Sequence, residues 1–238
     1  MGLSLLKSGS GPDVVLVPGL QGDPGVFRPL VSCLQDYRIW GFRLSRGGLD
    51  QDATVLHRSM ERQGVERPRL VAGSYGGQVG LRLNGPLHSL VLVGSFGRWE
   101  QVPRKRRMAL RWALRMPEGL LERRYNATLV SRLVADGVPR EVAESLHGPG
   151  GRALRTRLRS LVGAGGSMLA QPTLWIAGVE DAQAPWSHEA MRRVWPRVVS
   201  QRLPGRHRPY ASHPEEFASA LKSWWDSVDA EHQQGPGS

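Results

Sequence analysis

Short runs of apolar residues alternate along the chain with segments that have the periodicity of amphipathic helices. The apolar runs are rich in Val, Ile and Leu, and they cover residues 13–19, 37–45, 69–74, 88–95, 172–181 and 198–205. Such nearly continuous apolar character is typical of strands in a parallel sheet covered on both faces. Helices are predicted between the runs, at about residues 26–36, 51–64, 75–84, 186–195 and 214–228. The alternation predicts an α/β fold with a doubly wound, mostly parallel sheet.

One interval interrupts this alternation. Residues 98–168 contain no strand pattern, only an arginine-rich helical pattern broken by Gly and Pro. We therefore expect one α/β core, made of residues 1–97 and 169–230, with residues 98–168 inserted as a helical cap. Residues 231–238 are polar and rich in Gly and Pro, and they are predicted to be disordered.

Composition narrows the possible classes of protein. The 238 residues are 40% hydrophobic, which is enough to bury one sizeable core. Cys33 is the only cysteine, so a disulfide or a cysteine-based metal site within the chain is excluded, and we expect Cys33 to be a small core residue. No apolar run approaches the roughly 18–20 residues of a membrane-spanning helix, and the first residues lack the apolar stretch of a signal peptide. These features predict a cytoplasmic protein.

A serine lies between glycines where the run 69–74 passes into the predicted helix 75–84. Such a junction can raise the hydroxyl of Ser74 above a sheet only if the neighbouring residues are small. A serine nucleophile also needs a general base and an acid that orients the base. Asp181 ends a later apolar run and His207 follows the last one. All three side chains are therefore predicted at the carboxyl edge of the sheet, where such sheets place ligand sites.

Four motifs in sequence order make the chain resemble the α/β-hydrolase superfamily, specifically its short single-domain members with a helical cap. They are Pro18-Gly19-Leu20, Ala72-Gly73-Ser74-Tyr75-Gly76, Gly178-Val179-Glu180-Asp181 through Pro185, and Gly205-Arg206-His207 through Pro214 and Phe217. The resemblance extends from about residue 8 to residue 226. It implies the α/β-hydrolase fold over nearly the whole chain.

The resemblance also implies a mechanism, acyl transfer to water. Ser74 would attack a carbonyl carbon, His207 would take the serine proton, and Asp181 would hold the imidazole tautomer. Backbone N–H groups of Leu20 and Tyr75 would form the oxyanion hole. No cofactor and no metal ion is required by this chemistry.

Two features depart from the family pattern. Pro18 stands where the family usually has a histidine, which leaves the geometry of the oxyanion hole open. The segment before the run 13–19 is short, so the usual first antiparallel strand is expected to be missing or reduced.

Other residues compete for some of these roles. His213 lies close to His207, but it precedes Pro214 at a predicted helix start, which favours a capping or surface role. Glu180 neighbours Asp181, and in an extended segment its side chain points the opposite way. The remaining histidines are interpreted as solvated surface residues: His57, His88, His147 and His188.

The net charge of +11 is concentrated in the predicted cap. Residues 98–168 hold 15 basic residues against six acidic ones, an excess of nine positive charges. A solvated basic face is one interpretation. The other is that the cap docks an acidic carrier, such as an acyl carrier protein or the phosphates of coenzyme A, through Arg106, Arg107 and Arg111, as the resemblance to cap-bearing carboxylesterases suggests. No nucleic-acid motif accompanies the charge, so nucleic acid is not an expected partner.

These observations favour a serine hydrolase that cleaves a carboxylic ester or thioester of a small-molecule or carrier-bound acyl group. Trp99 and Trp112, in or beside the cap, are candidates for lining the acyl pocket. We expect a monomer or a weak homo-oligomer. A noncatalytic α/β-hydrolase-like binding protein remains the alternative, although a pure binder has no need for the Ser, Asp and His set.

Overall fold

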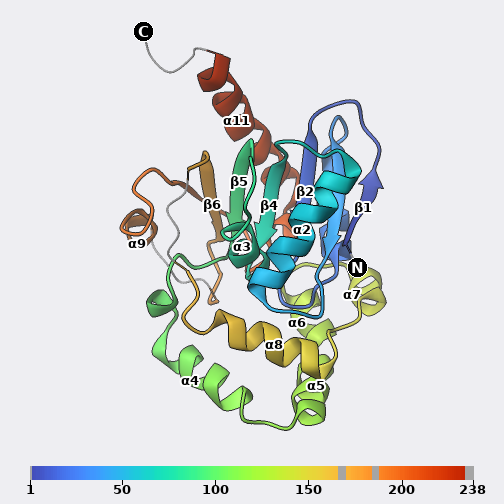
Figure 1. Ribbon diagram of the computed structural model, residues 1–238, viewed down its shortest axis with the longest axis vertical. Helices are drawn as coiled ribbons and strands as arrows, with labels where there is room; N and C mark the ends of the chain where they lie inside the picture. The colour runs from blue at the N-terminus through green and yellow to red at the C-terminus, as the bar shows by residue number, and fades with distance from the viewer. Residues whose placement is uncertain (1, 166–169, 184–187, 234–238) are drawn as a thin grey trace.

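The computed structural model describes residues 2–165, 170–183 and 188–233, and it contains a mostly parallel sheet between two layers of helices (Figure 1). The described strands form one seven-stranded sheet with the order β1-β3-β2-β4-β5-β6-β7. They are β1 (Gly2–Lys7), β2 (Asp13–Val17), β3 (Arg38–Arg43), β4 (Arg69–Gly73), β5 (Ser89–Val93), β6 (Thr173–Gly178) and β7 (Val199–Leu203). Each of the six predicted apolar runs contains one of the parallel strands. The predicted doubly wound α/β sheet is therefore confirmed.

The first strand corrects one expectation from the sequence. β1 is present and pairs antiparallel with β3, from Gly2 opposite Arg43 to Lys7 opposite Ile39, with an irregularity after Leu5. It lies at the edge of the sheet, and its side chains are half-buried or exposed. An edge strand of this kind has no continuous apolar run, so the pattern that identifies buried strands missed it.

The two faces of the sheet are covered by different helices (Figure 1). Val14 and Leu16 contribute to the apolar cluster beneath α1 (Arg28–Cys33) and α11 (Pro214–Gln233). Val15 and Val17 contribute to the opposite cluster. That cluster packs against α2 (Leu49–Gln63), α3 (Tyr75–Gly80) and α9 (His188–Arg192). Alternate residues of β2 thus face opposite layers, as a strand requires.

The C-terminal helix corrects a second expectation. α11 continues to Gln233, so residues 231–233 are helical rather than disordered. The rest of the expected tail, residues 234–238, lies outside the described residues. Two short elements also contribute to the apolar cluster beneath α1 and α11. They are η1 (Pro24–Phe27), which leads into α1, and α10 (Pro209–Ser212), which precedes α11.

A helical insertion separates β5 from β6 and lies across the carboxyl ends of the parallel strands (Figure 1). It consists of η2 (Trp99–Gln101), α4 (Arg104–Ala113), α5 (Glu118–Ala127), α6 (Leu129–Ala135), α7 (Arg140–Ser145) and α8 (Gly151–Leu161). The insertion has a small apolar cluster that is separate from the two clusters of the sheet, and its buried members are Leu121, Leu154 and Leu158. Among the described residues, no helix is both long and apolar enough to cross a membrane.

Candidate active site

Ser74 occupies a sharp turn between β4 and α3. Its backbone has φ 51° and ψ −112°, a conformation that is rare outside glycine. A Cβ atom on Gly76 would lie 2.5 Å from the carbonyl oxygens of Val17 and Pro18, and one on Gly77 would lie 2.4 Å from Ser95 Oγ. The small residues after the serine are therefore needed so that α3 can start directly against β2 and the loop after β5.

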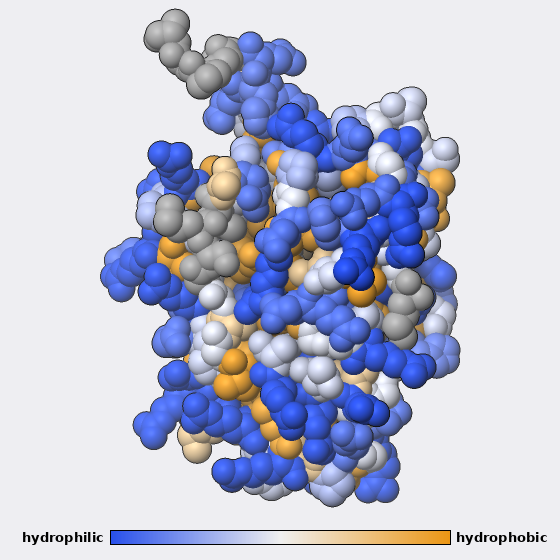
Figure 2. All heavy atoms as spheres, viewed as in Figure 1, coloured by the Kyte–Doolittle hydropathy of each residue, from blue (hydrophilic) through white to orange (hydrophobic). Residues whose placement is uncertain are grey.

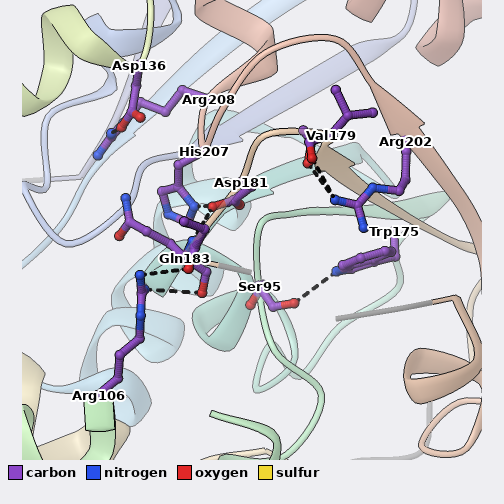
Figure 3. Close-up of polar contacts among 12 residues, drawn as sticks. Ser95, Arg106, Asp136, Trp175, Val179, Asp181, Gln183, Arg202, His207 and Arg208 are labelled. Atoms are coloured by element: carbon purple, nitrogen blue, oxygen red, sulfur yellow. Dashed lines mark hydrogen bonds and ion pairs between the residues drawn. The ribbon is translucent and has the colours of Figure 1, made fainter. Parts of the chain in front are cut away.

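His207 and Asp181 meet at the carboxyl ends of two neighbouring strands, β7 and β6. His207 Nδ1 lies 2.8 Å from Asp181 Oδ2, and both side chains are almost completely buried (Figure 3). The other carboxylate oxygen of Asp181 accepts the backbone N–H of Gln183 at 2.7 Å. Gly94 has φ 58°, and a Cβ there would lie 2.9 Å from His207 Cε1. A glycine at this position leaves room for the imidazole ring.

A cavity of about 520 Å³ connects Ser74 with His207. Ser74, Tyr75 and His207 line its floor at the sheet edge, and Leu20 lines it from the loop after β2. Most of the remaining lining is apolar and comes largely from the insertion: Phe96, Trp99, Val102, Ala109, Leu110, Ala113, Met116, Leu121, Leu158 and Leu161. Three arginines, Arg106, Arg124 and Arg132, line the cavity as well. The volume and the lining are typical of a small-molecule site. In Figure 2 the insertion, at the bottom of the view, is mostly hydrophilic with a narrow apolar strip.

The sequence of this chain matches the model of the alpha/beta hydrolase family over residues 14–220. The chain belongs to that family. The seven-stranded order and the position of the helical insertion agree with the family fold that the sequence motifs implied. A comparison with curated protein sequences finds no significant match.

Solved structures of other hydrolases resemble this family member in fold. A thermophilic esterase from Thermogutta terrifontis aligns with a TM-score of 0.73 and 20% identity, covering 95% of this chain and 93% of that one. An esterase from Rhodococcus sp. aligns with a TM-score of 0.71 and 21% identity, covering 95% and 94%. An N-acyl homoserine lactonase aligns with a TM-score of 0.76 and 14% identity, covering 95% and 93%. At these identities the likeness concerns the fold.

The two competing residues in this hydrolase lie away from the cavity lining. His213 Nδ1 is 2.9 Å from Ser212 Oγ, directly before the first residue of α11. Glu180 is exposed and lies 3.8 Å from the guanidinium of Arg206. Among the described residues, His207 is thus the histidine that borders the same cavity as Ser74.

The loop that carries Leu20 lies directly against the serine. A Cβ on Gly19 would lie 3.5 Å from Ser74 Cβ, and the N–H of Gly22 donates to Gly19 O at 3.0 Å. The carbonyl oxygen of Leu20 accepts a 2.7 Å hydrogen bond from Arg157 Nη1. The loop is therefore held both by its own turn and by a side chain from the insertion.

The structure separates the two tryptophans proposed for the pocket. Trp99 is buried, lines the cavity and packs edge-on against Phe96, with ring centroids 6.2 Å apart. Trp112 is 60% exposed and does not line the cavity, so that prediction was wrong. The reason is the rotation of α4, because its inward residues are Leu110 and Ala113, which leaves position 112 on the outer face.

The arginines proposed for carrier docking do not share one outward face. Arg106 lines the cavity, and its guanidinium donates to the carbonyl oxygens of Ala182 at 2.8 Å and Gln183 at 3.3 Å (Figure 3). Arg107 is half-buried, and Arg111 is exposed. Carrier docking through these three residues stays a prediction, but Arg106 lines the cavity and not the outer face of α4. Arg106 instead links α4 to the loop that holds Asp181.

Two further expectations concern residues outside the cavity. His88 is not a solvated residue, because its Nε2 lies 2.8 Å from Asp229 Oδ1 and burial lowers the pKa of its ring. Cys33 is half-buried at the margin of the core.

The side chain of His188 lies outside the described residues. Among the described residues, no group of three or more His, Cys, Asp or Glu side chains could hold a metal ion.

A buried polar network that the sequence did not predict lies beside the site. Asp52, on α2, accepts hydrogen bonds from the Tyr75 hydroxyl and from the backbone N–H of Ser45. Burial raises the pKa of Asp52 and of Tyr75, and it lowers the pKa of Arg157. Asp52 and Arg157 belong to segments that look like ordinary amphipathic helices, so no local signal marked them.

Proposed function

We propose that this alpha/beta hydrolase is a serine hydrolase that cleaves a carboxylic ester or thioester through an acyl-enzyme intermediate. The observation that carries the proposal is the 2.8 Å contact between His207 and Asp181 at the edge of the cavity that Ser74 lines from a strained turn. In this proposal residues 98–168 act as the cap over a core of residues 1–97 and 169–230.

The geometry supports a defined role for each side chain. With its proton on Nδ1, His207 donates to Asp181, which leaves Nε2 as the atom that accepts the Ser74 proton. Ser74 Oγ then bonds to the carbonyl carbon. The tetrahedral intermediate expels the alcohol or thiol, which takes the proton from His207. Water activated by the same histidine releases the acid and restores Ser74.

The oxyanion hole is assigned to two backbone donors, the N–H groups of Leu20 and Tyr75. The support is positional: both residues line the cavity, the Leu20 loop packs against Ser74, and Tyr75 is the first residue of α3. The positive end of the helix dipole adds to a donor at that position. Losing one such donor costs about 2.7–4 kcal/mol of transition-state stabilisation in serine hydrolases.

The experiment that tests the proposal is labelling with a fluorophosphonate, combined with a panel of p-nitrophenyl esters and acyl thioesters of graded chain length. We expect the wild type to be labelled at Ser74 and to hydrolyse members of the panel, and Ser74→Ala to do neither. A folded wild-type protein that is neither labelled nor active on any member would favour the noncatalytic binding protein instead.

The outer face of α4 supports a second, finer proposal, that the acyl substrate is presented by an acidic carrier protein. This face exposes Trp112 and Met108, each with about three-fifths of its surface accessible. The exposed basic residues around them are Arg104, Lys105, Arg111 and Arg115, and no acidic residue lies on α4. An acidic surface with an apolar centre would complement this face in charge and polarity.

Salt dependence tests the carrier proposal. Exposed charges are screened beyond about 8–10 Å at ordinary ionic strength. Added salt should therefore lower kcat/KM for an acyl chain on acyl carrier protein while leaving a neutral p-nitrophenyl ester unchanged. The double variant Arg111→Glu/Arg115→Glu should act in the same way. An equal salt response for both substrates would contradict carrier docking and leave a small-ester hydrolase.

A further inference from the structure

A buried arginine from the insertion reaches the loops beneath the candidate active site. Arg157, on α8, is 4% exposed. Its Nη1 donates to Leu20 O at 2.7 Å, and its Nη2 donates to Ser45 O at 2.7 Å. The fit is close, because a Cβ on Gly22 would lie 2.6 Å from Nη1. One guanidinium thus joins α8 to the loops that follow β2 and β3.

A buried carboxylate extends this network to the nucleophile turn. Asp52 is fully buried and interacts electrostatically with the Arg157 cation. Its Oδ1 accepts the Ser45 N–H at 2.6 Å, and its Oδ2 accepts the Tyr75 hydroxyl at 3.0 Å. The network therefore links Leu20 at one end to Tyr75 at the other.

The two ends of the network are the residues whose backbone N–H groups are assigned to the oxyanion hole. Neither Arg157 nor Asp52 lines the cavity, so neither touches a substrate held there. Burying two charges carries a large desolvation cost, and well-packed apolar residues often replace such pairs without loss of stability. Stability alone therefore does not account for this pair, whereas the precise placement of two backbone donors does.

We propose that Arg157 and Asp52 are positioning residues that set the geometry of the oxyanion hole and make it depend on the docking of α8. The hydrogen bond from Arg157 fixes the carbonyl of Leu20 and hence the conformation of that residue. The hydrogen bond from Tyr75 to Asp52 fixes the side chain at the first position of α3. This inference rests on the proposed hydrolase function.

The primary test is Arg157→Met, assayed with the best p-nitrophenyl ester and a boronic acid that forms a tetrahedral adduct with serine. A displacement of about 1 Å in an active site can cost roughly 100-fold in rate. We expect kcat to fall roughly 10- to 100-fold, KM to change less than about threefold, and boronate affinity to fall in parallel with kcat. Active enzyme is counted by the final extent of fluorophosphonate labelling.

The matched control is Arg69→Met. Arg69 is also a buried arginine on an ion pair, with Nη2 2.6 Å from Asp229 Oδ2, but it starts β4 at the end opposite Ser74. Its loss should lower the melting temperature without changing kcat per labelled site. If Arg157→Met gives the same unchanged kcat and boronate affinity, the positioning role is wrong while the proposed function stands. If the wild type is neither labelled nor active, both proposals fail.

Two milder variants decide the question if Arg157→Met does not fold. Arg157→Lys retains the charge but replaces the two Nη donors, which reach two separate carbonyls, with a single ammonium nitrogen, and we expect kcat to fall about three- to tenfold. Tyr75→Phe removes only the hydroxyl at the other end of the network, and we expect kcat to fall about three- to tenfold. In an Arg157→Lys/Tyr75→Phe double variant the two effects should be less than additive, since both loosen the same network. Full additivity, or unchanged kcat in Tyr75→Phe, would contradict the inference.

Discussion

At the scale of single residues, the geometry around Ser74 rests on a few positions where the backbone conformation or the available space favours a small residue. Ser74 has a positive φ, and Gly76 allows α3 to begin against the carbonyls of Val17 and Pro18. Gly94 provides the space for the ring of His207. The strained backbone of Ser74 is held where its N–H donates to Val93 O at 2.7 Å and where α3 packs against the carbonyls of Val17 and Pro18, and strained conformations persist at functional sites through such surroundings.

The first prediction separates the two histidines near the end of the chain. His207→Ala should lower kcat/KM for an ester by roughly 10⁴-fold or more, because the members of a triad act as a unit. His213→Ala should stay within about threefold of wild type, since His213 contacts Ser212 before α11 rather than the cavity. Steady-state kinetics on both variants checks this, and the reverse order of effects would contradict the assignment of the base.

At the scale of secondary-structure elements, α4 has two faces with different surroundings. The inner face contributes Arg106, Ala109, Leu110 and Ala113 to the cavity, whereas the outer face carries the exposed Trp112. Periodicity identifies the helix, but it does not specify which side meets the rest of the molecule. The proposed function depends on that orientation, because one side lines the cavity and the other is exposed.

Trp112 tests this orientation of α4, and Trp99 of η2, which lines the cavity, serves as the reference. Trp99→Ala should raise KM for longer acyl esters about tenfold, because burying a large apolar side chain against a ligand contributes about 1.5–3 kcal/mol. Trp112→Ala should leave KM for a small ester unchanged and alter stability by less than about 0.5 kcal/mol, as exposed substitutions usually do. Chain-length profiles of KM for both variants provide the measurement. An effect of Trp112→Ala on KM as large as the one expected for Trp99→Ala would mean that α4 is rotated differently.

The pairing of β2 with β3 gives a second prediction at this scale. Asp13 opposes Arg38 at the start of the two parallel strands and also accepts the indole N–H of Trp40 at 2.7 Å. Burial alone would raise the pKa of Asp13, but these hydrogen bonds and the Arg38 charge together lower it. A lowered pKa means that the stabilisation is present above about pH 4 and is lost as the pH falls through the folded-state pKa.

Asp13→Asn should therefore lower the free energy of unfolding at neutral pH, and the difference from wild type should shrink below about pH 4. Chemical denaturation of both proteins from pH 7 to pH 3 measures this. A difference that does not change with pH would show that the carboxylate charge is not responsible.

At the scale of the whole molecule, different elements cover the two ends of the sheet. The insertion covers the carboxyl ends of the strands, while α11 is fastened near their amino ends (Figure 1). There Asp229 of α11 contacts both Arg69 and His88, and the guanidinium of Arg69 stacks over Trp225. This partly buried cluster joins the last helix to β4 and to the residue before β5, and none of its members lines the cavity.

The cluster predicts an acid-sensitive stability. Burial lowers the pKa of His88, and the nearby Arg69 and His232 lower it further against the opposing effect of Asp229. A histidine with a lowered pKa binds fewer protons when folded, so its stabilising effect is present above about pH 6.5 and is lost as the pH falls through the folded-state pKa.

His88→Gln should therefore flatten the decline of stability between about pH 6.5 and pH 5 while leaving kcat per labelled site unchanged. Thermal unfolding of wild type and variant across this range provides the comparison. If the melting temperatures of wild type and variant fall equally steeply with decreasing pH, His88 is not the titrating group.

Local pattern was enough to predict the doubly wound sheet and to identify Ser74, Asp181 and His207 as neighbours. Buried parallel strands need continuous apolar runs, and a turn such as the one at Ser74 needs small residues, so both leave a signature in adjacent positions. The order of strand ends along a parallel sheet then brings distant residues to one edge.

Tertiary structure alone decided the features that depend on contacts without a local signature. The exposed edge strand β1 pairs through its backbone, which leaves little trace in side-chain type. The outward position of Trp112 depends on how α4 packs. The Arg157 guanidinium meets the backbone carbonyl of Leu20 across 137 residues of sequence, and each residue has an unremarkable neighbourhood in its own segment. Such contacts arise only when the fold brings separate elements together, because hydrogen-bond geometry is specified by the packing of both partners and not by either segment.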